Sequence, residues 1–215
     1  MVATLSTPLT KRVHLEGISW PTYQAMLKDM GDHRLTRLLY DRGWLEITMP
    51  SELHEIINRI LDRIITALTE ELTLKVKAYG STTLDRADLE KGIEPDSCYY
   101  IQNADRIQAR RLNLQTDPPP DLVVEVDITS SSQRRFGLYE QLQIPEVWRY
   151  QEHHGVTFYC LQSGTYRECE YSQTFPMLSA IKLGEFLTLA EAEDDNTVIR
   201  ALRRWVQAEL LDDAQ

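Results

Sequence analysis

One short run of residues, from Leu122 to Ile128, constrains the fold of this chain more than any other stretch. Five of its seven residues are leucine or β-branched, three prolines precede it, and a serine cluster follows it. A short, nearly continuous apolar run is typical of a strand that is covered on both faces. The pattern therefore predicts a central strand in a mixed α/β sheet.

Two carboxylates, Glu125 and Asp127, interrupt this apolar run. Because residues two apart in a strand point to the same face, both acids are expected to converge at the strand's C-terminal end. Burying an unpaired carboxylate is costly, so a neutralising group is expected beside them. A divalent cation is one such group, and an arginine or lysine is another. The remaining alternative is that the strand end emerges into solvent.

The length of 215 residues fits a single domain with a substantial core. We expect an N-terminal tail over residues 1–18, the main domain over residues 19–189, and a C-terminal helix within residues 190–215 that packs on the same domain. The sequence has neither a run of eighteen apolar residues nor a signal-peptide pattern, which predicts a cytoplasmic protein without membrane contact. The three cysteines lack CxxC spacing, which argues against a structural zinc site and a disulfide framework.

The formal net charge of -10 argues against tight, non-specific DNA binding, because proteins that neutralise many phosphates are usually basic. It does not exclude a metal-dependent phosphodiesterase, whose site is itself built from carboxylates. Arg106, Arg110 and Arg111 could supply phosphate contacts in such an enzyme. The simpler interpretation of this cluster is a solvated helix face.

Apolar periodicity, capping residues and turn residues place the other elements. Helices are predicted at residues 20–30, 51–72 and 196–211, and a further helix follows the serine run and ends before Pro145. Strands are predicted at residues 34–40, 44–49, 74–78, 97–101, 122–128, 146–150, 156–161 and 166–171. Residues 80–96 form a turn-rich connection, which is usually functional or mobile.

The longest predicted helix carries an acid close to its apolar stripe. Ile56, Ile60 and Ile64 are expected to face the core, and Glu55 borders that stripe in the first turn. The Glu55 carboxylate is therefore either aimed along the edge of the sheet or simply complements the helix N-terminus. His54 is a lone histidine, which is more often structural than a ligand.

Four motifs, in this order, resemble the Uma2 family. They are PSELHEIINRIL (Pro50–Leu61), GIEPDSCYYI (Gly92–Ile101), PPDLVVEVDITSSS (Pro119–Ser132) and IPEVWRY (Ile144–Tyr150). The family comprises restriction-endonuclease-like proteins that are abundant in cyanobacteria, and the resemblance covers roughly residues 19–189. It implies the α/β fold of PD-(D/E)XK nucleases, a central mixed β-sheet flanked by helices.

The resemblance also implies a site and an activity. Asp96 and Glu125 would hold Mg²⁺, with Mn²⁺ as a substitute, and Glu55 would help to place metal or water. Hard oxygen ligands suit Mg²⁺, which keeps several waters and lets one of them be activated as a nucleophile. The implied activity is endonucleolytic hydrolysis of DNA, for which a homodimer would suit cleavage of both strands.

The motif departs from the family pattern at its lysine, where this chain has Asp127. In related members a lysine comes instead from the following helix, and the matching residue here is Arg135. We expect Arg135 to enter the cleft, bind phosphate and offset Asp127, although an arginine stays protonated and cannot serve as a general base. The implied catalytic set is therefore Glu55, Asp96, Glu125, Asp127 and Arg135.

The missing lysine and the acidic net charge leave a second class of function open. The chain could keep the nuclease fold as a catalytically silent binding or interaction module. An enzyme of unrelated chemistry has little support, because the sequence has no glycine-rich phosphate loop, zinc-ligand spacing or nucleophile elbow.

Overall fold

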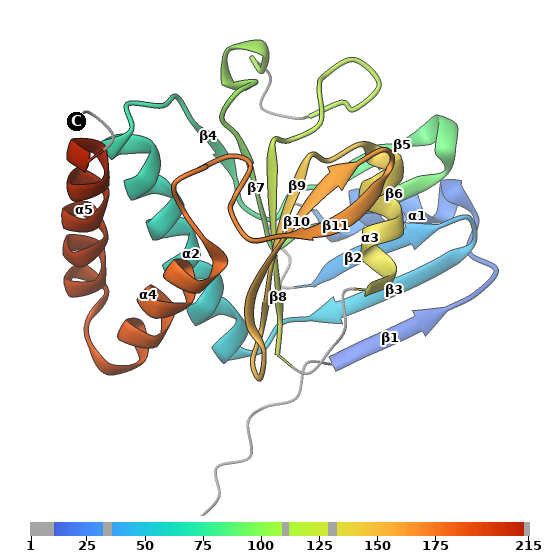
Figure 1. Cartoon of the computed structure of the whole chain (residues 1–215). Coiled ribbons are helices and arrows are strands. Elements are labelled where there is room, and N and C mark those ends of the chain that lie inside the picture. Colours follow the sequence, from blue (N-terminus) through green and yellow to red (C-terminus); the bar gives the residue numbers. More distant parts are fainter. Residues whose placement is uncertain (1–10, 32–35, 109–111, 129–132, 213–215) are drawn as a thin grey trace, which may run out of the picture.

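A computed structural model describes residues 11–31, 36–108, 112–128 and 133–212. These residues form two β-sheets with helices packed against them (Figure 1). The elements in chain order are β1 (Lys11–Leu15), α1 (Trp20–Met30), β2 (Arg37–Asp41), β3 (Trp44–Met49), α2 (Glu52–Glu71), β4 (Lys77–Tyr79), β5 (Leu84–Arg86), η1 (Ala87–Leu89), β6 (Lys91–Ile93), β7 (Ser97–Tyr100), η2 (Ala104–Arg106), β8 (Leu122–Asp127), α3 (Gln133–Leu142), β9 (Glu146–Gln151), β10 (Gly155–Gln162), β11 (Thr165–Cys169), α4 (Ala180–Ala192) and α5 (Asp195–Asp212).

The larger sheet is mixed, as predicted, and runs in the order β11-β10-β9-β8-β7-β4. Only β8 and β9 pair in parallel among these strands. All six residues of β8 are buried, which confirms the predicted central strand. Helices α2, α4 and α5 lie together on one side of this sheet (Figure 1). Their apolar side chains and those of the sheet form the largest core cluster.

The smaller sheet is antiparallel throughout, in the order β1-β3-β2-β6-β5. Helix α1 packs on its outer face, where Tyr23 stacks on Tyr40 with ring centroids 4.8 Å apart. A Cβ at Gly92 would lie 2.2 Å from the Tyr23 hydroxyl oxygen, so the close approach of helix and sheet requires glycine there. A second apolar cluster joins this sheet to α3 and to the mixed sheet.

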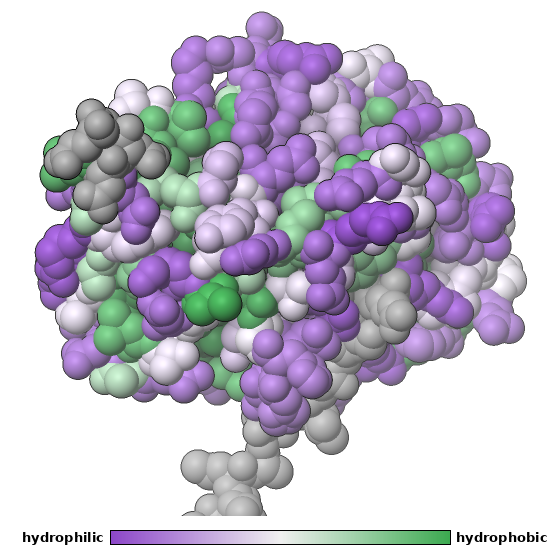
Figure 2. Space-filling view, in the orientation of Figure 1, coloured by the Kyte–Doolittle hydropathy of each residue, from purple (hydrophilic) through white to green (hydrophobic). Residues whose placement is uncertain are grey.

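Hydropathy differs across the surface. Figure 2 shows hydrophobic patches mainly over the helical side of the molecule, where α2, α4 and α5 lie, and mostly hydrophilic residues over the hairpin of β10 and β11. Ile181 of α4 and Leu211 of α5 are among the exposed hydrophobic residues.

Serine caps and a tight turn set the ends of several of these elements. Ser19 and Ser51 cap α1 and α2, accepting hydrogen bonds from the backbone N–H groups of Thr22 and His54. Strands β2 and β3 pair across Arg42 and Gly43, both of which have positive φ. The serine run at residues 130–132, after which a helix was predicted, lies outside the described residues.

The phase predicted for α2 holds at Ile60 and Ile64 and is wrong at Ile56. Ile56 is 57% exposed, whereas Ile57, Ile60 and Ile64 are buried. The reason is that His54 takes the inward position in the first turn, so the buried face follows His54 and Ile57 at helical spacing and Ile56 lies beside it.

Three elements differ from the sequence-based expectations. Within the expected tail over residues 1–18, Lys11–Leu15 pairs with β3 as an edge strand. The turn-rich connection at residues 80–96 contains the short strands β5 and β6. Helix α4 was not predicted, because it contacts both β10 and α5 and therefore lacks one clear apolar stripe.

Candidate active site

Four elements bring ionisable side chains to one pocket. Asp96 stands directly before β7, Glu125 and Asp127 end β8, Arg135 lies in the first part of α3, and His54 lies in the first turn of α2. All five side chains line the same pocket. The sequence-based expectation that the two acids of β8 share one region is thereby met, and neither emerges into solvent.

Glu125 is held by two side chains of α3. Arg135 Nη1 donates to both of its carboxylate oxygens, at 3.0 Å and 2.9 Å, and the Tyr139 hydroxyl donates to Oε1. Burial raises the pKa of Glu125 to about 7, and the nearby Asp96 charge adds to this, although Arg135 opposes it. The Glu125 carboxyl is thus fixed in place in a strongly desolvated position.

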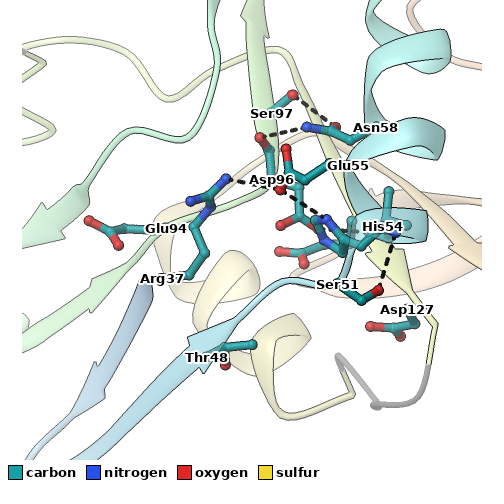
Figure 3. Close-up of polar contacts among 12 residues, drawn as sticks. Arg37, Thr48, Ser51, His54, Glu55, Asn58, Glu94, Asp96, Ser97 and Asp127 are labelled. Atoms are coloured by element: carbon teal, nitrogen blue, oxygen red, sulfur yellow. Dashed lines mark hydrogen bonds and ion pairs between the residues drawn. The ribbon is translucent and has the colours of Figure 1, made fainter. Parts of the chain in front are cut away.

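Asp96 is held by a histidine and by the backbone. Its Oδ2 lies 2.9 Å from His54 Nε2 and accepts a hydrogen bond of 2.8 Å from the Val126 N–H. Burial would raise the pKa of Asp96, but His54 and the Arg135 charge bring it below its usual value. Burial acts to lower the pKa of His54, yet Asp96 and Glu55 raise it to about 9. At neutral pH His54 is therefore a buried cation beside Asp96 (Figure 3).

Asp127 has a cation of its own on the neighbouring strand. Arg149 of β9 donates from Nε to Asp127 Oδ2 at 2.7 Å. The expectation that Arg135 offsets Asp127 is therefore wrong: Arg135 reaches Glu125 instead. The parallel register of β8 and β9 sets Arg149 opposite Glu125, and Asp127 is the next residue of β8 on the same face. The long Arg149 side chain can therefore reach Asp127.

Glu55 lies at the edge of the group. Its side chain is 54% exposed, with Oε1 3.3 Å from His54 Nδ1 and 3.7 Å from Arg37 Nη2. The neighbouring His54 imidazole lowers the pKa of Glu55. His54 lies between Glu55 and Asp96 and contacts both. Glu55 also lies in the first turn of α2, where a negative charge interacts favourably with the helix dipole.

Sequence reasoning missed several residues of the group. His54 could have been found, because it shares the helical phase of Ile57, and Tyr139 could have been found one turn after Arg135. Glu46 carried no such signal: it is buried on β3, with Oε2 3.1 Å from His14 Nε2. Its neighbours include Arg12 and Arg135.

Of the arginine cluster that the sequence suggested for phosphate contacts, the structure describes Arg106. Arg106 lies in η2, where its Nη1 donates to Asn103 at 2.8 Å. Arg110 and Arg111 lie outside the described residues.

Asp96 and Glu125 fit an oxygen-liganded cation in the type of donor. Both are buried carboxylates of one pocket. The carboxylate contacts of Asp96 with the described residues involve Oδ2, so Oδ1 has no described hydrogen-bond donor. No group of three or more His, Cys, Asp or Glu among the described residues is arranged to hold a metal. Such a site would therefore offer two protein ligands and fill its other positions with water, as Mg²⁺ sites commonly do.

Residues 20–190 match the family model of Uma2, which is described as "Putative restriction endonuclease". The chain belongs to the Uma2 family. Among solved structures, this Uma2 chain is similar to one described as "a putative nuclease belonging to DUF820", from Anabaena variabilis. The two are 13% identical with a TM-score of 0.57, and the match covers 78% of this chain and 98% of that chain. The predicted restriction-endonuclease-like α/β fold is thereby confirmed.

A search of the curated proteins gave no match. None of the described helices is long and apolar enough to cross a membrane.

Proposed function

We propose that this Uma2 chain is a Mg²⁺-dependent endodeoxyribonuclease that hydrolyses phosphodiester bonds of DNA. The observation that carries the proposal is the burial of Asp96 and Glu125 in one pocket, with Asp96 directly before β7 and Glu125 near the end of β8. Membership of a family described as "Putative restriction endonuclease" supports the same chemistry.

Asp96 and Glu125 would hold the ion, which would supply charge shielding at the phosphate and a bound water of lowered pKa. The other residues keep these two ligands in place. Tyr139 and Arg135 fix the Glu125 carboxylate, and His54 with the Val126 N–H fixes that of Asp96. A site held in this way loses little free energy to rearrangement when substrate binds.

Arg135 can replace the missing lysine only as a positive charge. It stays protonated, so it serves to stabilise negative charge on a phosphate and not to remove a proton from water. Its Nη1 is engaged by Glu125, while Nη2 lies 3.9 Å from Glu46 Oε1. The second amino group is the one we assign to the phosphate.

The alternative is a catalytically silent binding module, and one observation favours it. Each acid of the pocket already has a cation beside it: Arg135 for Glu125, His54 for Asp96 and Arg149 for Asp127. A pocket that is compensated in this way is stable without a metal ion.

Cleavage of supercoiled plasmid DNA with Mg²⁺ or Mn²⁺ distinguishes the two functions. We expect cleavage by the wild type and a roughly thousandfold loss in Asp96→Ala, because a bound metal contributes several kcal/mol to such reactions. Arg135→Lys should cleave at least as fast as the wild type. Asp62→Asn is the matched control, since Asp62 accepts a hydrogen bond from Tyr99 on the helical side of the sheet and should leave cleavage unchanged.

No metal-dependent cleavage by any of these proteins would favour the silent module. A crystal soaked in Mn²⁺ gives an independent result: an anomalous peak between Asp96 and Glu125 is expected, and its absence would contradict the metal site.

We also propose that the protein is cytoplasmic. We further expect a homodimer, because two nearby sites would cleave both strands of a duplex. Light scattering on the purified chain, with and without duplex DNA, measures the mass. A monomer under both conditions would contradict the dimer.

A further inference from the structure

Arg37 lines the pocket and comes from the antiparallel sheet. It opens β2 of the antiparallel sheet, where its Cα pairs with that of Thr48. The next residues along β2 alternate between the two faces: Leu38 packs under α1, and Leu39 packs in the cluster between the sheets. Arg37 lies on the Leu39 side, and its guanidinium points toward Asp96 and Glu55 (Figure 3).

The guanidinium of Arg37 is poorly satisfied for its degree of burial. The side chain is only 13% exposed, and its sole ion pair with a described residue is the 3.7 Å contact of Nη2 with Glu55. That contact is longer than a hydrogen bond, and Glu55 itself is half-exposed. The Arg37 Nε is buried and donates no hydrogen bond to any described residue. A buried N–H donor without an acceptor costs free energy, and a bound acceptor would recover that cost.

Two nearby arginines, in contrast to Arg37, have close carboxylate partners. Arg135 contacts Glu125 at 2.9 Å, and Arg149 contacts Asp127 at 2.7 Å. Each of these arginines has a buried carboxylate within hydrogen-bonding distance. Arg37 instead lines the same pocket with donors to spare.

A phosphate group is the acceptor that suits these donors. The pocket carries several carboxylates, and Glu125 already offsets much of the Arg135 charge. A second cation that has no close carboxylate would therefore strengthen the binding of an incoming phosphodiester. A planar guanidinium binds two oxygens of one phosphate through parallel N–H donors.

We infer that Arg37 is a substrate-binding residue that holds a backbone phosphate of DNA, on the side of the pocket formed by the antiparallel sheet. The inference rests on the proposed function for the identity of the ligand. It assigns the small sheet a part in substrate binding, while the mixed sheet carries Asp96 and Glu125.

Binding of a fluorescein-labelled DNA duplex, followed by anisotropy in Ca²⁺ at several salt concentrations, tests the inference. Arg37→Gln should weaken binding by roughly tenfold, which corresponds to one charge-assisted hydrogen bond. The slope of log affinity against log salt should fall by about 0.9, the value for one phosphate contact. Arg37→Lys should keep the slope of the wild type and bind more tightly than Arg37→Gln but less tightly than the wild type. Lysine keeps the positive charge but lacks the parallel N–H donors of the guanidinium.

Two further variants separate binding from structural effects. Arg204→Gln removes a charge from an exposed position on α5 and should change neither affinity nor slope. Glu55→Gln removes the ion-pair partner that Arg37 has among the described residues, and it should not reduce the slope. A structural role for Arg37 would instead make Arg37→Gln and Glu55→Gln alike, with lowered melting temperatures and an unchanged slope, and would overturn the inference.

Plasmid cleavage by the same proteins judges the proposed function separately. Cleavage by the wild type with an unchanged slope in Arg37→Gln overturns the role of Arg37 and leaves the nuclease standing. A reduced slope without cleavage by the wild type supports Arg37 and contradicts the nuclease. Failure of the wild type to bind the duplex at any salt concentration overturns the inference.

Discussion

The two faces of β8 are built on opposite principles. Val124 and Val126 point into the cluster formed with α2, α4 and α5, where packing is apolar. Glu125 and Asp127 point to the other face, where each meets an arginine. The apolar face depends on volume, because a lost methyl leaves a cavity. The acidic face depends on pairing, because a lost partner leaves a buried charge.

Arg135→Met is expected to have the largest effect on stability. Removing one partner of a buried ion pair costs about 3–5 kcal/mol, since Glu125 would remain buried without its cation. Urea denaturation of the metal-free protein measures the change. Arg134→Met is the control in the same helix: Arg134 is exposed and lies over the Trp44 ring at 4.2 Å, so it should cost about 0.5–1 kcal/mol. Equal losses in both variants would contradict the contrast between the faces.

Leu61→Ala tests the apolar face. The side chain is buried in the helical cluster, so we expect the free energy of unfolding to fall by about 3 kcal/mol. The cleavage rate per folded molecule should stay unchanged, because Leu61 contacts the face of the sheet opposite to the pocket. A tenfold loss of that rate under conditions where the protein is fully folded would show that the two faces are coupled.

Arg63→Ala should have the smallest effect. Arg63 contacts Asp195 at 2.9 Å and Asn196 at 2.7 Å between α2 and α5, at an exposed position. Solvent screens such pairs, so a loss of about 0.5 kcal/mol is expected. A loss as large as that of Leu61→Ala would mean that docking of α5 depends on charge and not on its apolar side chains.

Sequence reasoning predicted the parts of the fold that depend on local pattern. The central strand, the capped helices and the β10–β11 hairpin follow from composition, capping residues and turn residues. Edge strands such as β1 and β5 were missed because backbone pairing with a distant strand needs no apolar pattern. Helix α4 was missed because its burial is shared among β10, α5 and α2.

The acids of the site were foreseeable, and their partners largely were not. Asp96 and Glu125 interrupt or border apolar runs, where an acid is conspicuous. Arg149 and Arg37 look like ordinary strand arginines until the pairing register places them. The partner of Arg135 was misassigned for the same reason: spacing along the chain cannot tell which of two neighbouring acids a long side chain reaches.

The parallel pairing of β8 with β9 also has a consequence for how the chain folds. Glu125, Arg135, Tyr139 and Arg149 all come from the strand, helix and strand between residues 122 and 151. Their contacts close only short loops, which cost little chain entropy. Asp96 and Arg37 join through contacts much more distant in sequence. We therefore expect hydrogen exchange during refolding to protect β8, α3 and β9 early, and the ends of β2 and β7 later.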